Sequence, residues 1–239
     1  MKLFVTGATG LTGRHVVAAL REEAPDAEVV AHVRPDSSRL DHWQTHFDAL
    51  GASVDVTPWL PAAMNETLHT RKPTHVFALL GTTKKRGREA KTSGSEETYE
   101  TIDYGLSKIA LDAAVRAGSN PRFLYLSSMG VGPGASGAYL KVRHRLETEV
   151  RASGLPWVIA RPSFIIGERD QDRPMEHVGS VLGDGALALV GVFGGKKIRE
   201  KYRSQTGAEL GRALARLALD ANATECLAES DELRARAKS

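Results

Sequence analysis

The chain has 239 residues, of which 41% are hydrophobic and 26% are charged, which is the composition of an ordinary globular protein. Its 32 basic and 29 acidic residues nearly balance, so the charge predicts no nucleic-acid partner. No apolar run approaches the roughly 20 residues that cross a bilayer, and the first residues lack the apolar core of a signal peptide. The single cysteine, Cys226, cannot form an internal disulfide. We therefore predict one cytosolic domain over residues 1–239, with no membrane partner.

Short β-branched runs alternate with longer amphipathic segments along the chain. This alternation is typical of repeated βα units, in which helices cover both faces of a parallel sheet. Six strands are expected, at residues 2–6, 28–33, 53–56, 75–80, 122–126 and 157–160. Helices are expected at residues 13–23, 41–50, 61–70, 99–117, 138–153 and 208–219. The predicted fold class is a doubly wound, mostly parallel α/β sheet, a Rossmann fold, with residues 162–239 as a small cover on the substrate side.

A glycine-rich turn follows the first expected strand directly and precedes the first helix. Gly7, Gly10 and Gly13 have the spacing of the dinucleotide-binding fingerprint. The first glycine permits a tight turn, the second lets backbone amides approach a pyrophosphate, and the third lets the helix pack closely on the strand. We expect cofactor phosphates to bind at this turn, which consists of Gly7, Ala8, Thr9, Gly10, Leu11, Thr12 and Gly13.

The residue that follows the second strand bears on which dinucleotide binds. An NAD site places an acidic residue there, about 20 residues after the turn, to accept hydrogen bonds from the ribose hydroxyls. This chain has Arg34, whose planar guanidinium suits the 2′-phosphate of NADP, and Ser37, Ser38 and Arg39 add donors nearby. The sequence therefore predicts NADP as the cofactor. NAD stays an alternative, because the nearby Asp36 is an acidic residue of the kind that an NAD site uses.

Several motifs together resemble a known superfamily. The turn Thr6-Gly7-x-x-Gly10-x-x-Gly13, the pair Ser127-Ser128 and the stretch Arg161-Pro162-Ser163-Phe164-Ile165-Ile166-Gly167 are similar to the extended and atypical short-chain dehydrogenases/reductases. Within that superfamily, Leu80-Gly81-Thr82-Thr83, Ile102-Asp103-Tyr104 and Tyr139-Leu140 resemble the Tat-interacting-protein oxidoreductase branch and its bacterial NAD(P)-binding or epimerase-like relatives. The resemblance covers most of the chain and implies hydride transfer between a nicotinamide and a substrate.

The resemblance also implies a catalytic group of three side chains. In the superfamily a Tyr exchanges a proton with the substrate, a Lys four residues later lowers its pKa and holds the ribose, and a Ser or Thr orients the substrate oxygen. Tyr139 and Ser128 match this pattern, although some members place the hydroxyl one position later, where Met129 stands. The position of the Lys is taken by Arg143, which keeps a permanent charge and cannot relay a proton as Lys can.

Further cofactor contacts follow from the same resemblance. Asp55 would meet the adenine amino group, Leu80 and Gly81 would let the backbone pass close to the adenosine ribose, and Ser127 would contact the cofactor. No metal site is expected, because His42 and His46 lack a third ligand nearby.

Three functions remain open at this level. The first is an NADP(H)-dependent oxidoreductase that acts on a small carbonyl or alcohol. The second is a regulatory or redox-sensing NAD(P)-binding protein without turnover, which the replacement of Lys by Arg143 would permit. The third is a nucleotide-sugar epimerase-like enzyme. Basic clusters at residues 84–88 and 196–201 could attract an anionic substrate. The chain would act as a monomer or a homodimer, and nothing in the sequence identifies the substrate.

Overall fold

The computed structural model describes residues 1–82, 98–166 and 204–238. Within these ranges the main sheet has seven strands, all parallel, in the order β3-β2-β1-β4-β5-β6-β9. The strands are β1 (Lys2–Thr6), β2 (Glu28–His32), β3 (Ser53–Asp55), β4 (His75–Ala78), β5 (Arg122–Leu126), β6 (Trp157–Arg161) and β9 (Cys226–Glu229). The predicted doubly wound parallel sheet is confirmed.

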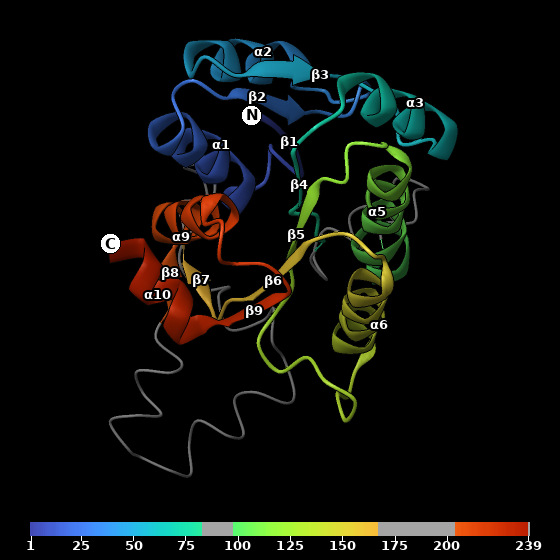
Figure 1. The fold of residues 1–239 in the computed structure, drawn as a ribbon, viewed down its shortest axis with the longest axis vertical. Helices are drawn as coiled ribbons and strands as arrows, with labels where there is room; N and C mark the ends of the chain where they lie inside the picture. Colours follow the sequence, from blue (N-terminus) through green and yellow to red (C-terminus); the bar gives the residue numbers. More distant parts are fainter. Residues whose placement is uncertain (83–97, 167–203, 239) are drawn as a thin grey trace.

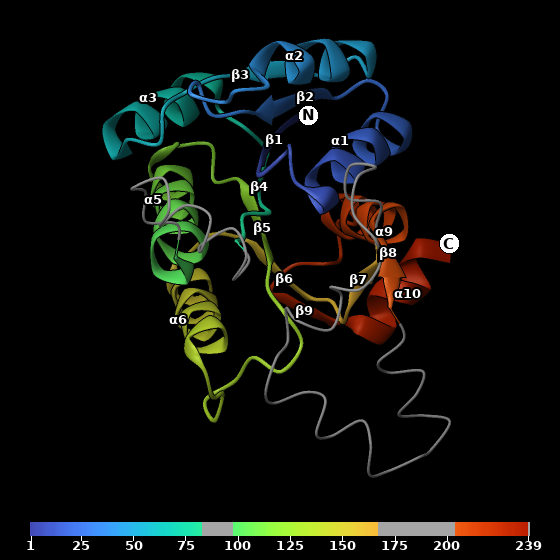
Figure 2. The ribbon, with the colours of Figure 1, turned by 180° about the vertical axis from the view of Figure 1, so that it is seen from behind.

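Helices cover both faces of this sheet (Figures 1 and 2). One face carries α1 (Leu11–Glu23), α2 (Leu40–Ala49), α9 (Gly207–Leu219) and α10 (Ser230–Lys238), and the other carries α3 (Pro61–Arg71), α5 (Ser107–Arg116) and α6 (Ala138–Ala152). Strand residues alternate between the two layers, so that Leu3 and Val5 pack under α1 while Phe4 packs under α3 and α5. Burial on both faces explains why the strands read as nearly continuous apolar runs.

The direction of the strand order reverses between β1 and β4. The chain adds β2 and β3 on one side of β1, and then crosses over to place β4, β5, β6 and β9 on the other. In open α/β sheets, ligands bind beyond the carboxyl ends of the strands at this switch point. The glycine-rich turn follows β1 there, and residues 79–82 follow β4.

The helix expected at residues 99–117 is divided into two parts. Tyr99–Leu106 form a π-helical segment, η1, which continues into α5. Thr98 and Thr101 close its first turn with a reciprocal capping box. Asp103 is the buried residue of η1 and is only 1% exposed. Short π-helical segments are often found at functional sites.

The elements after α9 were not predicted from the sequence. Strand β9 pairs in parallel with β6 and extends the main sheet, α10 follows it, and α9 packs on α1. A second, two-stranded parallel sheet joins β7 (Ile165–Ile166) to β8 (Gln205–Thr206). The described residues 204–238 therefore add strand and helix to the dinucleotide-binding fold itself. None of the helices in the described ranges combines the length and apolarity needed to cross a membrane.

Candidate functional site

The backbone of the glycine-rich turn is too crowded for side chains. Gly7 has a φ of +72°, and a Cβ there would lie 2.6 Å from the carbonyl oxygen of Leu79. A Cβ on Gly13 would lie 2.1 Å from the carbonyl oxygen of Gly7. The Gly10 N–H donates to the Gly7 carbonyl over 3.0 Å, which closes the turn. These contacts account for two of the three glycines by close approach of the backbone alone.

The first turn of α1 is suited to an anion. Its N-cap is Gly10, no side chain of the described residues caps it, and its first turn holds no acidic residue. The N–H groups of that turn therefore face outward with the positive end of the helix dipole. Ala8 and Thr12 are buried beneath the turn, whereas Thr9 and Leu11 are half-buried and Gly10 is exposed. This arrangement suits an anion such as a phosphate, and the binding of cofactor phosphates here stays a prediction.

Basic side chains lie near the end of β2. Arg34 is about half exposed and pairs with Asp36, with 3.5 Å between Arg34 Nε and Asp36 Oδ1. The guanidinium of Arg39 lies over the ring of Trp43, 5.2 Å from its centroid. Burial lowers the pKa of His46, and the positive charges of His42 and Arg14 lower it further. Arg14 follows the glycine turn directly, and no role was predicted for it from the sequence.

Asp55 uses its carboxylate within its own loop. Oδ1 accepts from the Thr57 N–H over 2.9 Å, and Oδ2 accepts from Arg71 Nε and from a terminal Arg71 nitrogen over 2.9 and 2.7 Å. Burial opposes ionisation, but Thr57 and Arg71 together hold the pKa of Asp55 below its usual value. The adenine contact suggested by the resemblance stays a prediction, and the side chain already ties β3 to α3.

Tyr139 lies at the start of α6 between two other side chains. The guanidinium carbon of Arg143, one helical turn later, is 4.7 Å from the centroid of the Tyr139 ring. The ring of Tyr99, from η1, meets the same ring edge-on at 5.1 Å and 61°. Tyr139 is therefore held by a cation–π contact and an aromatic contact while its side chain stays partly exposed.

Arg143 is buried and hydrogen-bonded to three acceptors. One terminal nitrogen donates to the Leu126 carbonyl over 2.5 Å, and the other donates to Asp103 Oδ1 over 2.8 Å and to the Leu80 carbonyl over 3.5 Å. The second oxygen of Asp103 accepts from the Thr82 N–H over 2.9 Å. Burial raises the pKa of Asp103 even though Arg143 and Thr82 act to lower it. For Arg143, burial is outweighed by Tyr139, Tyr125 and Asp103, which raise its pKa and keep it cationic.

Gly81 makes room for this pair. A Cβ at that position would lie 3.1 Å from a terminal nitrogen of Arg143 and 3.4 Å from Asp103 Oδ1. The resemblance predicted an adenosine ribose in the space beside Gly81. The close approach in the structure is made by the Arg143 and Asp103 side chains.

The two serines after β5 differ in their surroundings. Ser127 is buried and donates to Glu147 Oε1 over 2.6 Å, and Glu147 also accepts from Arg161 over 2.8 and 2.6 Å. Ser128 is partly exposed, and its hydroxyl makes a long 3.3 Å bond to the Met129 carbonyl. Ser127 therefore joins an internal ion network, whereas Ser128 keeps a partly exposed hydroxyl, and its contact with substrate stays a prediction.

Three residues of the site were not assigned a role from the sequence. Asp103 belongs to a motif used for the resemblance, and a carboxylate within an apolar helical stripe was the signal that could have singled it out. Tyr99 and Glu147 carried no such signal, because their importance depends on partners that are distant in sequence. Among the described residues, no three His, Cys, Asp or Glu side chains gather as a metal site would require. Thr83, Gly167 and both basic clusters lie outside the described residues.

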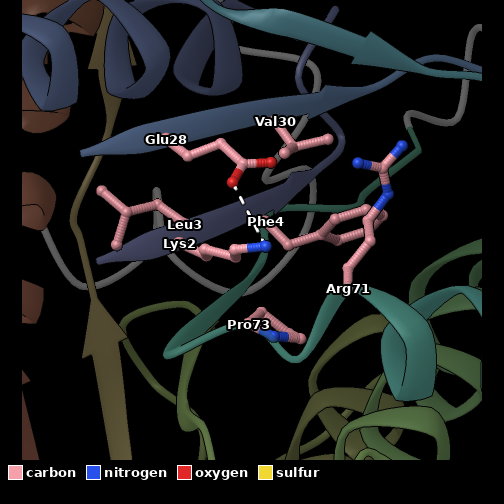
Figure 3. A pocket seen from close by; sticks show the side chains of 7 residues that line it. All are labelled: Lys2, Leu3, Phe4, Glu28, Val30, Arg71 and Pro73. Atoms are coloured by element: carbon pink, nitrogen blue, oxygen red, sulfur yellow. Dashed lines mark ion pairs between the residues drawn. The ribbon is translucent and has the colours of Figure 1, made fainter.

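A shallow depression lies at the opposite edge of the sheet (Figure 3). It encloses about 170 Å³, open solvent included, at the amino ends of β1 and β2, and the Lys2 Nζ to Glu28 Oε2 ion pair of 3.4 Å crosses it. Its remaining lining residues are Leu3, Phe4, Val30, Arg71 and Pro73. Because the glycine turn follows the carboxyl end of β1, this depression is separate from the candidate cofactor site.

Comparison with known proteins identifies the family. A model of the family described as NAD(P)H-binding matches residues 7–188. The chain belongs to this NAD(P)H-binding family. The protein fmp52, mitochondrial, of Aspergillus fumigatus is 31% identical over 71% of this chain and 69% of its own length. The protein FMP52, mitochondrial, of Candida albicans is 27% identical over 72% of this chain and 70% of its own.

Solved structures share the fold at low sequence identity. A nucleoside-diphosphate-sugar epimerase of Pseudomonas aeruginosa has a TM-score of 0.56 and 21% identity, covering 92% of this chain and 68% of that one. The enzyme WbmH of Bordetella bronchiseptica, in complex with NAD+, has a TM-score of 0.61 and 19% identity, covering 95% and 73%. The chain is thus an NAD(P)-binding Rossmann domain with structural neighbours among the extended short-chain dehydrogenases/reductases, as the motifs predicted.

The relatives correct one prediction. Their names describe them as mitochondrial, which contradicts the cytosolic location expected from the sequence. A lone cysteine and the lack of a signal-peptide pattern argue only against secretion. They do not distinguish the cytosol from the interior of an organelle.

Proposed function

We propose that this NAD(P)-binding protein is an NADP(H)-dependent oxidoreductase that interconverts a carbonyl and an alcohol on a small substrate. The observation that carries the proposal is the position of Tyr139. Its ring is held by Arg143 and Tyr99, and Arg143 is bonded to the carbonyls of Leu80, just beyond β4, and of Leu126, the last residue of β5. That is the same edge of the sheet as the glycine turn, where a nicotinamide and a substrate would meet.

The proposed chemistry assigns one task to each side chain. A dinucleotide bound at the glycine turn would supply or accept the hydride. Tyr139 gives a proton to the substrate oxygen in reduction and takes it back in oxidation. Ser128 donates a hydrogen bond to the same oxygen and orients it. The backbone N–H groups at the start of α1 hold the cofactor phosphates.

A turnover assay tests this proposal. NADPH oxidation is followed at its absorbance maximum with a panel of aldehydes, ketones and quinones, for the wild type and for Tyr139→Phe. We expect Tyr139→Phe to lose activity by about 10²-fold or more, since this is the usual contribution of a general acid or base. Tyr104→Phe is the matched control, because the Tyr104 hydroxyl is already engaged by Glu149 of α6. Equal activity of wild type and Tyr139→Phe would refute the assignment.

The preference for NADP over NAD rests on Arg34 and the basic residues around it. We expect Arg34→Glu to weaken NADPH binding by about tenfold or more, because it replaces a charge-assisted hydrogen bond to the 2′-phosphate with a repulsion. NADH binding should change little. Arg116→Glu, at the exposed end of α5, makes the same charge change on the other face of the sheet. Fluorescence titration with both cofactors measures the effect, and an unchanged preference would remove Arg34 from the cofactor site.

One observation favours a second candidate function. The position that the superfamily fills with a proton-relaying Lys holds Arg143, which is sealed in the interior. A regulatory or redox-sensing protein would bind the cofactor without needing that relay. It predicts tight NADPH binding together with no oxidation of NADPH by any member of the panel.

A further inference from the structure

Both terminal nitrogens of Arg143 are engaged within the protein. Its terminal nitrogens bond to Leu126, Asp103 and Leu80, and Nε, which is buried, has no hydrogen-bond partner among the described residues. The residue as a whole is 5% exposed. A side chain held in the interior by these bonds is not placed to contact a ribose.

The acceptors of Arg143 come from three separate elements. Asp103 belongs to η1, the Leu80 carbonyl follows β4, and the Leu126 carbonyl ends β5. Asp103 is itself fixed by the Thr82 N–H. The pair therefore ties together the two strand ends that border the candidate site, and the guanidinium carbon lies over the Tyr139 ring.

We infer that Arg143 and Asp103 form a buried positioning pair that sets the orientation of Tyr139, and that Arg143 does not contact the cofactor. The positioning role rests on the proposed function, whereas the lack of cofactor contact does not. A planar guanidinium spreads its donors over two terminal nitrogens, so it can reach two backbone carbonyls and a carboxylate on different elements while its carbon lies over an aromatic ring. An ammonium group is a single point of charge, so Lys at this position would lose part of the arrangement.

The test compares Asp103→Asn, Arg143→Gln, Arg143→Lys and the double variant Asp103→Asn/Arg143→Gln. Arg145→Gln is the matched control, because Arg145 lies on the same helix but pairs with Glu100 at the surface. We expect each variant of the pair to lower kcat by about tenfold or more and to change the Kd for NADPH by less than about twofold. The double variant should be no slower than the slower single variant, since both changes break one interaction.

A measurement without turnover accompanies the kinetics. In protein labelled with ¹³C-tyrosine, the ring resonance of Tyr139 is assigned by its disappearance in Tyr139→Phe. We expect Asp103→Asn and Arg143→Gln to shift this resonance and Arg145→Gln to leave it in place. If the wild type shows no turnover, the proposed function fails. The resonance still reports whether the pair orients Tyr139, and the Kd values for NADPH still report whether Arg143 contacts the cofactor.

Three results would overturn the inference. The first is NADPH binding weakened about tenfold by Arg143→Gln but unchanged in Asp103→Asn, which would make Arg143 a direct cofactor ligand. The second is an Arg143→Lys variant as active as the wild type, because Arg143 would then only stand in for Lys. The third is an unmoved Tyr139 resonance. If Arg143→Gln does not fold, Arg143→Lys and Asp103→Asn carry the same comparisons.

Discussion

Gly7 and Gly154 have nearly the same left-handed backbone, with φ of +72° and +77°, in very different surroundings. A Cβ on Gly7 would collide with the backbone of Leu79, whereas a Cβ on Gly154 would meet nothing within 4 Å. We expect Gly154→Ala to cost about 1–2 kcal/mol of unfolding free energy, which is the strain of the left-handed conformation alone. Gly7→Ala should cost at least about 1–3 kcal/mol more and abolish NADPH binding. Urea unfolding of both variants checks this, and equal losses would contradict it.

The glycine turn could be predicted from the sequence, whereas the surroundings of Arg143 could not. Gly7, Gly10 and Gly13 were assigned because their function depends on neighbours within one turn. Arg143 was assigned a role beside Tyr139, but its acceptors Asp103 and Leu80 are 40 and 63 positions away in the chain. Spacing along one helix gives the contact between residues four apart. Such spacing cannot show that the charge of Arg143 is already paired with Asp103.

Helices α1 and α9 meet more closely than ordinary side chains permit. A Cβ on Gly211 of α9 would lie 2.7 Å from the backbone carbonyl atoms of His15 on α1. Ala in place of Gly usually stabilises an exposed helix by about 1 kcal/mol. We expect Gly211→Ala to destabilise the protein instead, because the obstacle is backbone that cannot rotate away. Ala208→Gly, at an exposed position of α9, measures helix propensity alone. A higher Tm for Gly211→Ala would show that the two helices can separate at little cost.

Elements with a strong periodic signal were predicted almost to the residue. Strands β1 and β5 have the expected bounds, and α6 ends one residue earlier than expected. The π-helical segment η1 was missed, because its apolar spacing reads as an ordinary helix. Strand β9 was also missed. Its sequence, Cys-Leu-Ala-Glu, has no β-branched residue, and its position is fixed by pairing with β6 and not by its own propensity.

The pH dependence of stability is a property of the whole molecule in which His75 has a defined part. Burial and the nearby charge of Arg122 lower the pKa of His75 to about 4. The unfolded chain, with an imidazole pKa near 6.5, therefore binds a proton that the folded protein excludes. The contribution of His75 to the unfolding free energy is therefore fully present above pH 6.5. It is lost as the pH falls toward 4, by up to about 3 kcal/mol.

Replacing His75 by Gln should flatten the stability profile between pH 6.5 and 5. Denaturant unfolding at half-unit pH steps measures this slope, and His69→Gln, exposed on α3, is the control. The carboxylates begin to titrate below that range, so the upper part of the window is the informative one. An identical slope in His75→Gln would assign the acid sensitivity to other groups.

The contact between α1 and α9 has a consequence for synthesis. The helix that begins at the cofactor turn is made first, and Glu23 at its end pairs with Arg216 of α9, 193 positions later. A nascent chain on the ribosome therefore carries the glycine motif long before the layer that supports it exists. Cofactor capture should accordingly be a late event that waits until α9 has emerged.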